Sequence, residues 1–312
     1  MIAASFLQSA LDPAGPQAAH IARLWWLLLA IAVVVFVAVL GFLAAAILHR
    51  RRDTTEASLT YAVSIAVGLT VVTLFAILIV TVWTERINAT LGAASAVTIE
   101  LTGHQFWWEV QYDAANPVDR VTTANEMHIP VGRPVVLKVT SRDVIHSFWA
   151  PNLHGKRDLI PGYTTAIWLQ ADRPDVFRAQ CAEFCGRQHA HMALQIVAEP
   201  EPAFERWLNA ERAPAHDPTD AGALRGRDVF MKRQCVLCHQ IRGTSANGLV
   251  GPELTHLASR GTLAAGTLPN TTGHLAGWII NPQALKPGSQ MPQNAMASDE
   301  LQSLLAYLET LK

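Results

Sequence analysis

Two long apolar runs dominate the N-terminal third of this chain. Trp25–Leu48 and Leu59–Trp83 contain no Asp, Glu, Lys or Arg. At 1.5 Å of rise per helical residue, each run would span roughly 36 Å, enough to cross a hydrocarbon core about 30 Å thick. Buried core helices are the alternative, but such helices seldom exceed about 20 residues. The sequence therefore predicts two transmembrane helices, at about 24–48 and 58–84.

The charges around these runs predict their orientation. His49-Arg50-Arg51-Arg52 lies between them, whereas the outer flanks offer the single arginines Arg23 and Arg86. Because short loops rich in Lys and Arg stay in the cytoplasm, we expect both termini on the outer side of the membrane. The chain is only 16% charged and has a formal net charge of −1, which excludes a strongly basic nucleic-acid binder.

The remainder of the chain divides into two soluble parts, after an N-terminal segment and hairpin that occupy residues 1–95. Residues 96–200 contain short segments that alternate between apolar and polar residues, separated by Pro and Gly turns, and predict an all-β sandwich or Greek-key domain. The clearest of these segments are 97–102, 134–140, 166–170 and 193–197. Residues 201–221 read as a short helix, headed by Pro202, and a linker. Residues 222–312 predict an all-α domain.

The most specific motif is Cys235-Val-Leu-Cys238-His239. In a Cys-x-x-Cys-His string the two thiols add to the vinyl groups of haem and the histidine ligates the iron. A thioredoxin-like redox pair would need a surrounding βαβ pattern, and a zinc site would need a second ligand pair nearby. The sequence offers neither, so it predicts covalent attachment of haem c.

A second iron ligand is expected downstream of this motif. Met291 lies in the Pro- and Gly-containing loop Lys286–Pro292, and thioether ligation raises the reduction potential of a haem. Met296 is the alternative. The carbonyl of Pro252 is a candidate partner for the second ring nitrogen of His239, since ligating histidines usually donate that N–H to an acceptor.

A second constellation lies at the end of the predicted β domain. Cys181, Cys185, His189 and Met192 fall within one loop, and His146 lies earlier in the chain at an expected strand end. Thiolate, imidazole and thioether ligands suit copper. Two thiolates, two imidazoles and one thioether are more ligands than a single copper uses. The set fits two copper ions bridged by both sulfurs.

Two other interpretations of this loop remain open. Cys181, Cys185, His189 and His191 could hold a tetrahedral zinc ion, although zinc would leave Met192 without a role. A disulfide between the two cysteines is also permitted on the outer side of a membrane. The content of thiols and metals distinguishes the three.

Together these motifs resemble cytochrome c oxidase subunit II in the form fused at its C-terminus to a cytochrome c domain, as in caa-type oxidases. The resemblance rests on Gly103–Trp108, Asp143–Phe148, Arg157–Gly162 and the cysteine loop. It implies a multidomain membrane protein with a two-helix transmembrane hairpin, an all-β cupredoxin-like domain and an all-α class I cytochrome c domain. It also implies a bacterial cell (inner) membrane with the soluble domains in the periplasm.

The resemblance implies roles for particular residues. The dicopper ligands of the family correspond to His146, Cys181, Cys185, His189, Met192 and the backbone carbonyl of Glu183. The side chain of Glu183 corresponds to a magnesium (or manganese) ligand at the interface with subunit I. On pattern alone, Glu183 and Asp158 would be ordinary surface acids. His191 has no ligand counterpart in the family.

The chain departs from the family pattern at two places. The family usually has a tryptophan where this chain has Phe106, followed here by Trp107 and Trp108, so we expect an aromatic relay without one defined point of electron arrival. Glu56 is the only counterpart of a family glutamate at the start of the second membrane helix. Its surroundings match poorly, and a solvated helix flank is the alternative.

The implied function is electron transfer. Electrons would pass from cytochrome c or another donor through haem c and the dicopper centre to subunit I, where oxygen is reduced to water and protons are pumped. The partners implied are subunit I, subunit III, the donor and the lipid bilayer, with no nucleic acid. The alternative is an equivalent subunit of another terminal reductase, such as a copper-containing nitric oxide reductase.

Overall fold

The chain forms two compact units in a computed structural model that describes residues 8–48, 55–90 and 96–312. The first unit is the helical segment Gln17–Leu91. The second combines Met1–Pro16 with Gly92–Lys312 and contains both soluble domains.

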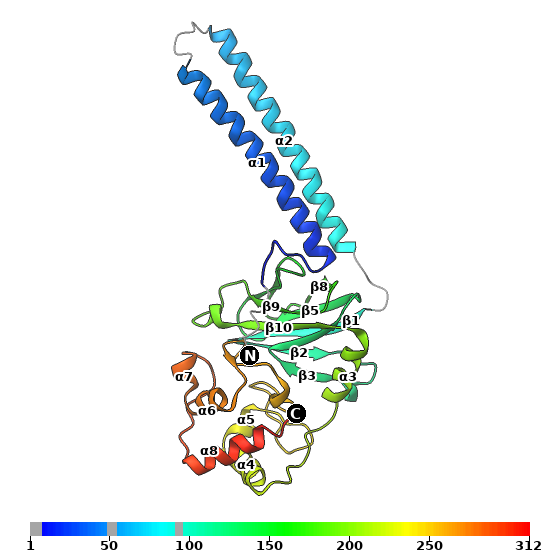
Figure 1. Ribbon diagram of the computed structural model, residues 1–312, viewed down its shortest axis with the longest axis vertical. Helices are drawn as coiled ribbons and strands as arrows, with labels where there is room; N and C mark the ends of the chain where they lie inside the picture. Colours follow the sequence, from blue (N-terminus) through cyan, green and yellow to red (C-terminus); the bar gives the residue numbers. More distant parts are fainter. Residues whose placement is uncertain (1–7, 49–54, 91–95) are drawn as a thin grey trace. The chain divides into compact units, whose positions relative to one another are not determined.

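The helical unit is a pair of long helices, α1 (Pro16–Leu48) and α2 (Glu56–Thr90), drawn in blue and cyan in Figure 1. Both are long and apolar enough to cross a membrane, as predicted. They are longer than predicted because helical structure continues through the more polar flanks. There, His20 Nδ1 lies 2.9 Å from Asn88 Oδ1. The basic segment 49–52, on which the predicted orientation rests, lies outside the described residues.

The β domain is a sandwich of two five-stranded sheets with the orders β3-β2-β1-β5-β8 and β4-β10-β9-β6-β7. The first sheet contains β1 (Val97–His104), β2 (Trp107–Tyr112), β3 (Val121–Ala124), β5 (Val135–Ser141) and β8 (Thr165–Leu169). The second contains β4 (Glu126–Pro130), β6 (His146–Trp149), β7 (Arg157–Leu159), β9 (Asp175–Cys181) and β10 (Ala193–Glu199). β1 pairs parallel with β5 and antiparallel with β2. The four segments predicted from alternation correspond to β1, β5, β8 and β10.

Alternation along the strands builds the core of the sandwich. Ile99 on β1 is paired with Leu137 on β5, and both side chains are fully buried. Phe177 and Ile196, on the second sheet, are fully buried in the same cluster. The N-terminal segment also joins this domain, because the Ala14 amide donates to the Asn152 carbonyl at 2.7 Å.

The C-terminal domain is helical and has a core of its own. Its helices, preceded by α3 (Glu201–Glu211), are α4 (Ala221–Lys232), α5 (Cys235–Cys238), α6 (Thr272–Ile280), α7 (Pro282–Leu285) and α8 (Ser298–Leu308). A short ribbon of β11 (Thr262–Leu263) and β12 (Leu268–Pro269) in this domain was not predicted. A 3-10 turn lies nearby at Leu257–Ser259, and the β domain contains 3-10 turns at Pro117–Asp119 and His189–His191. α4 packs tightly on α8, since a Cβ at Gly226 would meet the Ser303 carbonyl oxygen.

The segment predicted as a linker runs along the helical domain. The Ala215 amide donates to the Arg242 carbonyl at 3.0 Å, and Asp217 pairs with Arg227 at 2.9 Å. The Asp220 carboxylate then accepts from the Gly222 amide at 2.7 Å and caps α4. These bonds fasten the segment between the two soluble domains to the helical domain.

Candidate functional site

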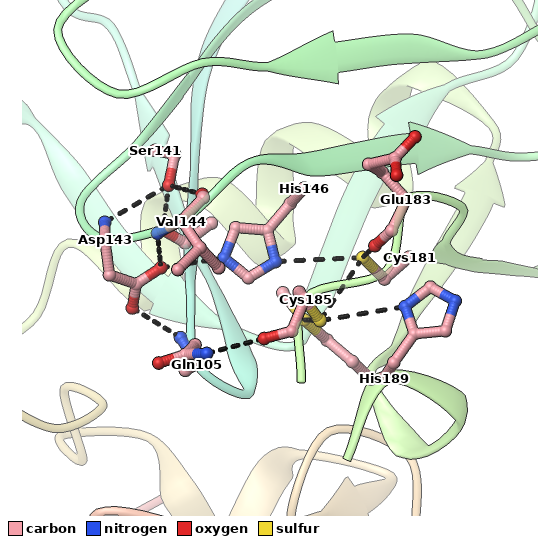
Figure 2. A network of polar contacts seen from close by, with 11 residues as sticks. Gln105, Ser141, Asp143, Val144, His146, Cys181, Glu183, Cys185 and His189 are labelled. Carbon is pink, nitrogen blue, oxygen red and sulfur yellow. Dashed lines mark hydrogen bonds and ion pairs between the residues drawn. The ribbon is translucent and has the colours of Figure 1, made fainter. Parts of the chain in front are cut away.

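The sulfur and imidazole groups of the cysteine loop converge in one cluster, shown in Figure 2. Cys181 Sγ and Cys185 Sγ lie 3.8 Å apart. His146 Nδ1 lies 3.7 Å from the first sulfur, and His189 Nδ1 lies 3.7 Å from the second. Met192 Sδ is 3.9 Å from Cys185 Sγ. The structure therefore brings together all five side chains that the sequence singled out for copper.

Neighbouring strands place these groups. β9 ends at Cys181 and β6 begins at His146, and the two strands are paired antiparallel with Phe148 opposite Cys181. The loop after β9 then returns Cys185 to the same point. The Glu183 carbonyl oxygen lies 3.2 Å from Cys181 Sγ, while its carboxylate is on the exposed side of the loop. Backbone and side chain of this one residue thus face different environments.

Asp143 orients the His146 ring. Its Oδ1 lies 2.8 Å from His146 Nε2, which leaves Nδ1 to face the sulfurs. Although burial raises the pKa of Asp143, hydrogen bonds from His146 and from the Gln105 and Val144 amides lower it overall. A Cβ at Gly103 would come 2.8 Å from the imidazole, so this position needs glycine for the ring to fit.

The two thiols cannot both ionise easily when they are this close. Hydrogen bonding from Cys185 lowers the pKa of Cys181, and His146 acts in the same direction although burial opposes it. The hydrogen bond to Cys181 and burial raise the pKa of Cys185. A thiolate therefore forms at one sulfur, and a cation is needed to hold the second as a thiolate. The donor set fits copper, which prefers thiolate, imidazole and thioether ligands.

The zinc interpretation requires His191, and the structure places this residue elsewhere. Its Nδ1 lies 2.8 Å from Gln188 Oε1 and its side chain is exposed. Met192, which zinc would not use, is fully buried beside Cys185. Both cysteines are free thiols in the structure.

Replacing Asp143 with asparagine is expected to weaken copper binding about ten- to a hundredfold, the usual cost of losing an acceptor that orients a ligating histidine. The asparagine amide has one acceptor oxygen where Asp143 uses two, so either His146 or the Gln105 amide loses its partner. Competition titration with a copper chelator measures the change. Asp175→Asn, at the start of β9, is the matched control, and equal affinities for the two variants would contradict the assigned role.

The second site is an apolar cavity in the helical domain. Cys235, Cys238, His239 and Met291 all line it. His239 Nδ1 lies 2.7 Å from the Pro252 carbonyl oxygen, which confirms the predicted contact. Burial lowers the pKa of His239, against the effect of this hydrogen bond, so the ring is held neutral with Nε2 free to ligate.

The residues around this cavity fit a haem. Gly251 lies against His239, since a Cβ there would come 2.7 Å from His239 Cε1. Arg260 is buried at the cavity wall and its Nε has no hydrogen-bond partner in the part of the chain that the structure describes. Its Nη2 donates to the Glu253 carbonyl at 2.6 Å, so the unpaired group is the Nε–H, which a haem propionate would satisfy. Met296 is not among the residues that line the cavity, whereas Met291 is.

Comparison with known protein families gives two matches along the chain. The family described as "Cytochrome C oxidase subunit II, periplasmic domain" matches residues 113–199, and the family described as "Cytochrome c" matches residues 223–312. The cytochrome c oxidase subunit 2 of Alkalihalophilus pseudofirmus is 34% identical over 97% of this chain and 91% of its own length. This chain belongs to the cytochrome c oxidase subunit II family. A cytochrome c domain follows its subunit II domain.

Other relatives of this subunit II cover less of the chain. The subunit 2 of Bacillus sp. is 28% identical over 70% of this chain and 63% of its own length. A crystal structure of the periplasmic domain of subunit II from Bradyrhizobium japonicum is 29% identical, covers 39% of this chain and 97% of that domain, and has a TM-score of 0.37. The family makes this chain a membrane protein with a periplasmic copper-binding domain, a haem domain and an oxidase complex as its partner.

The predicted aromatic relay of this subunit II, Phe106 to Trp108, lies between the two sites. Phe106 and Trp107 line the haem cavity, and Trp107 stacks on His104 with ring centroids 4.1 Å apart. Trp108 is fully buried, and its ring centroid lies 6.2 Å from that of His146. Its Nε1 donates to the Met192 carbonyl at 3.4 Å.

Two further residues were singled out from the sequence, Asp158 and Glu56. Asp158 is exposed on β7, opposite Ser147 of β6. Glu56 is the first residue of α2, and nothing in that helical unit assigns it a role.

Sequence reasoning assigned no role to Asp143 or Gln105. Gln105 Nε2 donates to the Cys185 carbonyl at 2.5 Å, and the backbone amide of Gln105 donates to Asp143 Oδ2 at 2.7 Å. An acid three residues before a ligand histidine is a local signal that could have identified Asp143. The residues that Gln105 joins are far apart in the sequence, and only the fold brings them together.

Proposed function

We propose that this chain is the electron-input subunit of a haem-copper oxidase, with haem c and a dicopper centre in series. One observation carries this proposal. Within one compact unit, Phe106 and Trp107 form part of the wall of the haem cavity, and the adjacent Trp108 packs against the copper ligand His146. When bound, the haem and the two copper ions supply one-electron redox chemistry at the two ends of this wall.

The residues of the helical domain hold the haem. Cys235 and Cys238 would hold the haem covalently, and His239 and Met291 would ligate its iron. The Pro252 carbonyl fixes the His239 tautomer, which would leave Nε2 free to ligate the iron. Gln283 donates to the Met291 carbonyl at 2.9 Å and shapes the loop that presents the thioether.

The residues of the β domain hold the dicopper centre. His146, His189 and Met192 would ligate the two copper ions together with the Cys181 and Cys185 thiolates, and the Glu183 carbonyl would supply an oxygen. Placing charge on two metals instead of one reduces the change in geometry when an electron arrives. The exposed Glu183 carboxylate is the proposed ligand of a magnesium ion at the subunit I interface.

The rest of the assignment follows the family. Phe106, Trp107 and Trp108 are the proposed aromatic relay. Subunits I and III are the proposed membrane partners, with cytochrome c or another carrier as the donor. The two helices cross the bacterial inner membrane with both termini on the periplasmic side. Reduction of oxygen to water and proton pumping belong to the complex.

Purification of the complex with its natural partners tests the function. Metal analysis is expected to find two copper ions per chain beyond those of subunit I, and reduced cytochrome c is expected to support oxygen uptake. Zinc in place of this copper would overturn the dicopper assignment. Uptake of nitric oxide without uptake of oxygen would favour the alternative reductase.

A further inference from the structure

Lys286 is a buried lysine that joins the two soluble domains. Its side chain is 2% exposed, and its Nζ donates to the Phe106 carbonyl at 2.9 Å and to the Ala264 carbonyl at 2.8 Å. Phe106 belongs to the β domain, whereas Lys286 and Ala264 belong to the haem domain. Burying an ammonium group is costly, and an apolar side chain would fill the same space. The two hydrogen bonds are therefore what a lysine, and not an apolar residue, adds at this position.

On the copper side, the backbone that Lys286 holds is itself fastened to the copper loop. Gln105, the residue before Phe106, donates through Nε2 to the Cys185 carbonyl at 2.5 Å. The Phe106 ring lies against the same loop, since a Cβ at Gly186 would come 3.2 Å from its Cζ. Two hydrogen bonds, joined through the neighbouring residues Gln105 and Phe106, thus lead from Lys286 to Cys185.

On the haem side, Lys286 is the C-cap residue that follows α7, and it begins the loop that carries Met291. Gln283 holds this loop from within, since its Oε1 accepts from the Gly288 amide at 2.9 Å and its Nε2 donates to the Met291 carbonyl at 2.9 Å. Lys286, Phe106 and Met291 all line the haem cavity. The lysine thus lies between the proposed iron ligand and the copper loop.

Other hydrogen bonds join the two domains along a seam, including one from the Gly261 amide to Glu126 Oε2 at 2.9 Å. The Ala193 amide donates to the Ala265 carbonyl at 3.0 Å, and Gln188 Nε2 donates to the Pro287 carbonyl at 2.9 Å. Ala264 and Ala265 have φ of 53° and 56°, a left-handed conformation that costs energy for alanine. Such a turn persists only when its surroundings hold it, and Lys286 bonds the carbonyl of its first residue.

We propose that Lys286 is a positioning residue for electron transfer within this chain: its two hydrogen bonds hold the haem domain against the loop that carries Cys185. This inference rests on the proposed function. Burial lowers the pKa of Lys286 to about 7. Because a neutral amine still has two N–H donors, one for each carbonyl, both protonation states can make the two bonds.

Lys286→Met in the complete oxidase complex tests the inference, because methionine keeps the length and apolar character of the stem but cannot donate. The variant loses both hydrogen bonds of the buried amine, so we expect fewer molecules to have the haem domain held against the copper loop. The rate of haem-to-copper electron transfer is expected to fall about tenfold. Flash photoreduction of the haem measures this rate. The near-infrared copper band and the ferrous haem spectrum are expected to stay unchanged. Lys232→Met, an exposed lysine on α4, is the matched control.

A second readout does not depend on electron transfer. Amide hydrogen exchange in the same complex is expected to become faster at Ala193, whose amide bonds across the seam, and to stay unchanged within α8. If Lys286→Met fails to bind haem, Gln188→Ala replaces it, because this change removes the bond to Pro287 from the copper side. It is expected to slow transfer and to speed exchange in the same direction.

Wild-type transfer and wild-type exchange in a folded variant with normal spectra would overturn the role of Lys286. That result would leave the proposed function intact, because the parent complex would still transfer electrons from haem to copper. The proposed function fails separately, if the parent complex itself lacks the copper or shows no transfer between the two sites.

Discussion

Replacing Cys185 with serine is expected to abolish the dicopper centre while the haem domain stays folded. Cys185 Sγ lies within 3.9 Å of three other ligand atoms, Cys181 Sγ, His189 Nδ1 and Met192 Sδ. A serine hydroxyl remains protonated at neutral pH and is a poor ligand for copper, which prefers the soft thiolate. Without the sulfur of Cys185, the proposed ligands His189 and Met192 no longer share an atom with Cys181 and His146, so the two copper ions are no longer held together.

The effect on the haem domain is expected to be small because the two domains have separate cores. Residues such as Phe148 and Phe177 fill the β sandwich, whereas Phe230, Leu304 and Tyr307 fill the helical domain. Metal analysis should therefore show the copper content falling from two ions per chain to below one, with loss of the near-infrared band. The ferrous haem absorption of the same sample should match that of the parent complex.

His191→Gln is the matched control for this change. It lies in the same loop, but its ring is exposed and bonds Gln188, so copper content is expected to stay at two ions per chain. Two copper ions retained in Cys185→Ser would show that the thiolates are not shared. Loss of metal in His191→Gln, with zinc in the parent protein, would support the tetrahedral zinc site instead.

Local periodicity was sufficient to predict the parts of the fold where it is strong. The uninterrupted apolar runs predicted α1 and α2, and strict alternation predicted β1 and β5. β6 was missed because three of its four residues, His146 to Phe148, are buried in succession, so no alternation is visible. In β2, Trp107 lies on the less buried face and disguises the alternation that Trp108, Val110 and Tyr112 follow.

The candidate sites were predictable where ligands cluster in the sequence. The loop from Cys181 to Met192 and the motif at Cys235 each place several ligands within a few residues, so their chemistry is visible locally. The contact between Lys286 and Phe106 joins residues 180 positions apart. No local sequence pattern marks the Lys286 amine or the Phe106 carbonyl as hydrogen-bond partners. Such contacts depend on how two separately folded domains meet, which periodicity does not encode.

Met291→Leu is the second change with a large expected effect: it should convert the haem from six-coordinate low-spin to five-coordinate high-spin iron. Leucine matches methionine in volume and apolar character, so the packing of this half-buried position is retained while the thioether is lost. Thioether ligation stabilises ferrous iron, so the reduction potential should fall as well. Ferrous and ferric absorption spectra, with a redox titration, measure both effects.

Met296→Leu is the informative control because both methionines pack against the same core, but Met291 alone of the two lines the cavity with His239. If Met291 is the ligand, Met296→Leu keeps a low-spin spectrum and Met291→Leu does not. The reverse pattern would assign the iron to Met296 and would require the loop held by Gln283 to rearrange. That rearrangement would also move Lys286 at the start of the loop, so the spectra of these two variants also test the geometry of the seam between the domains.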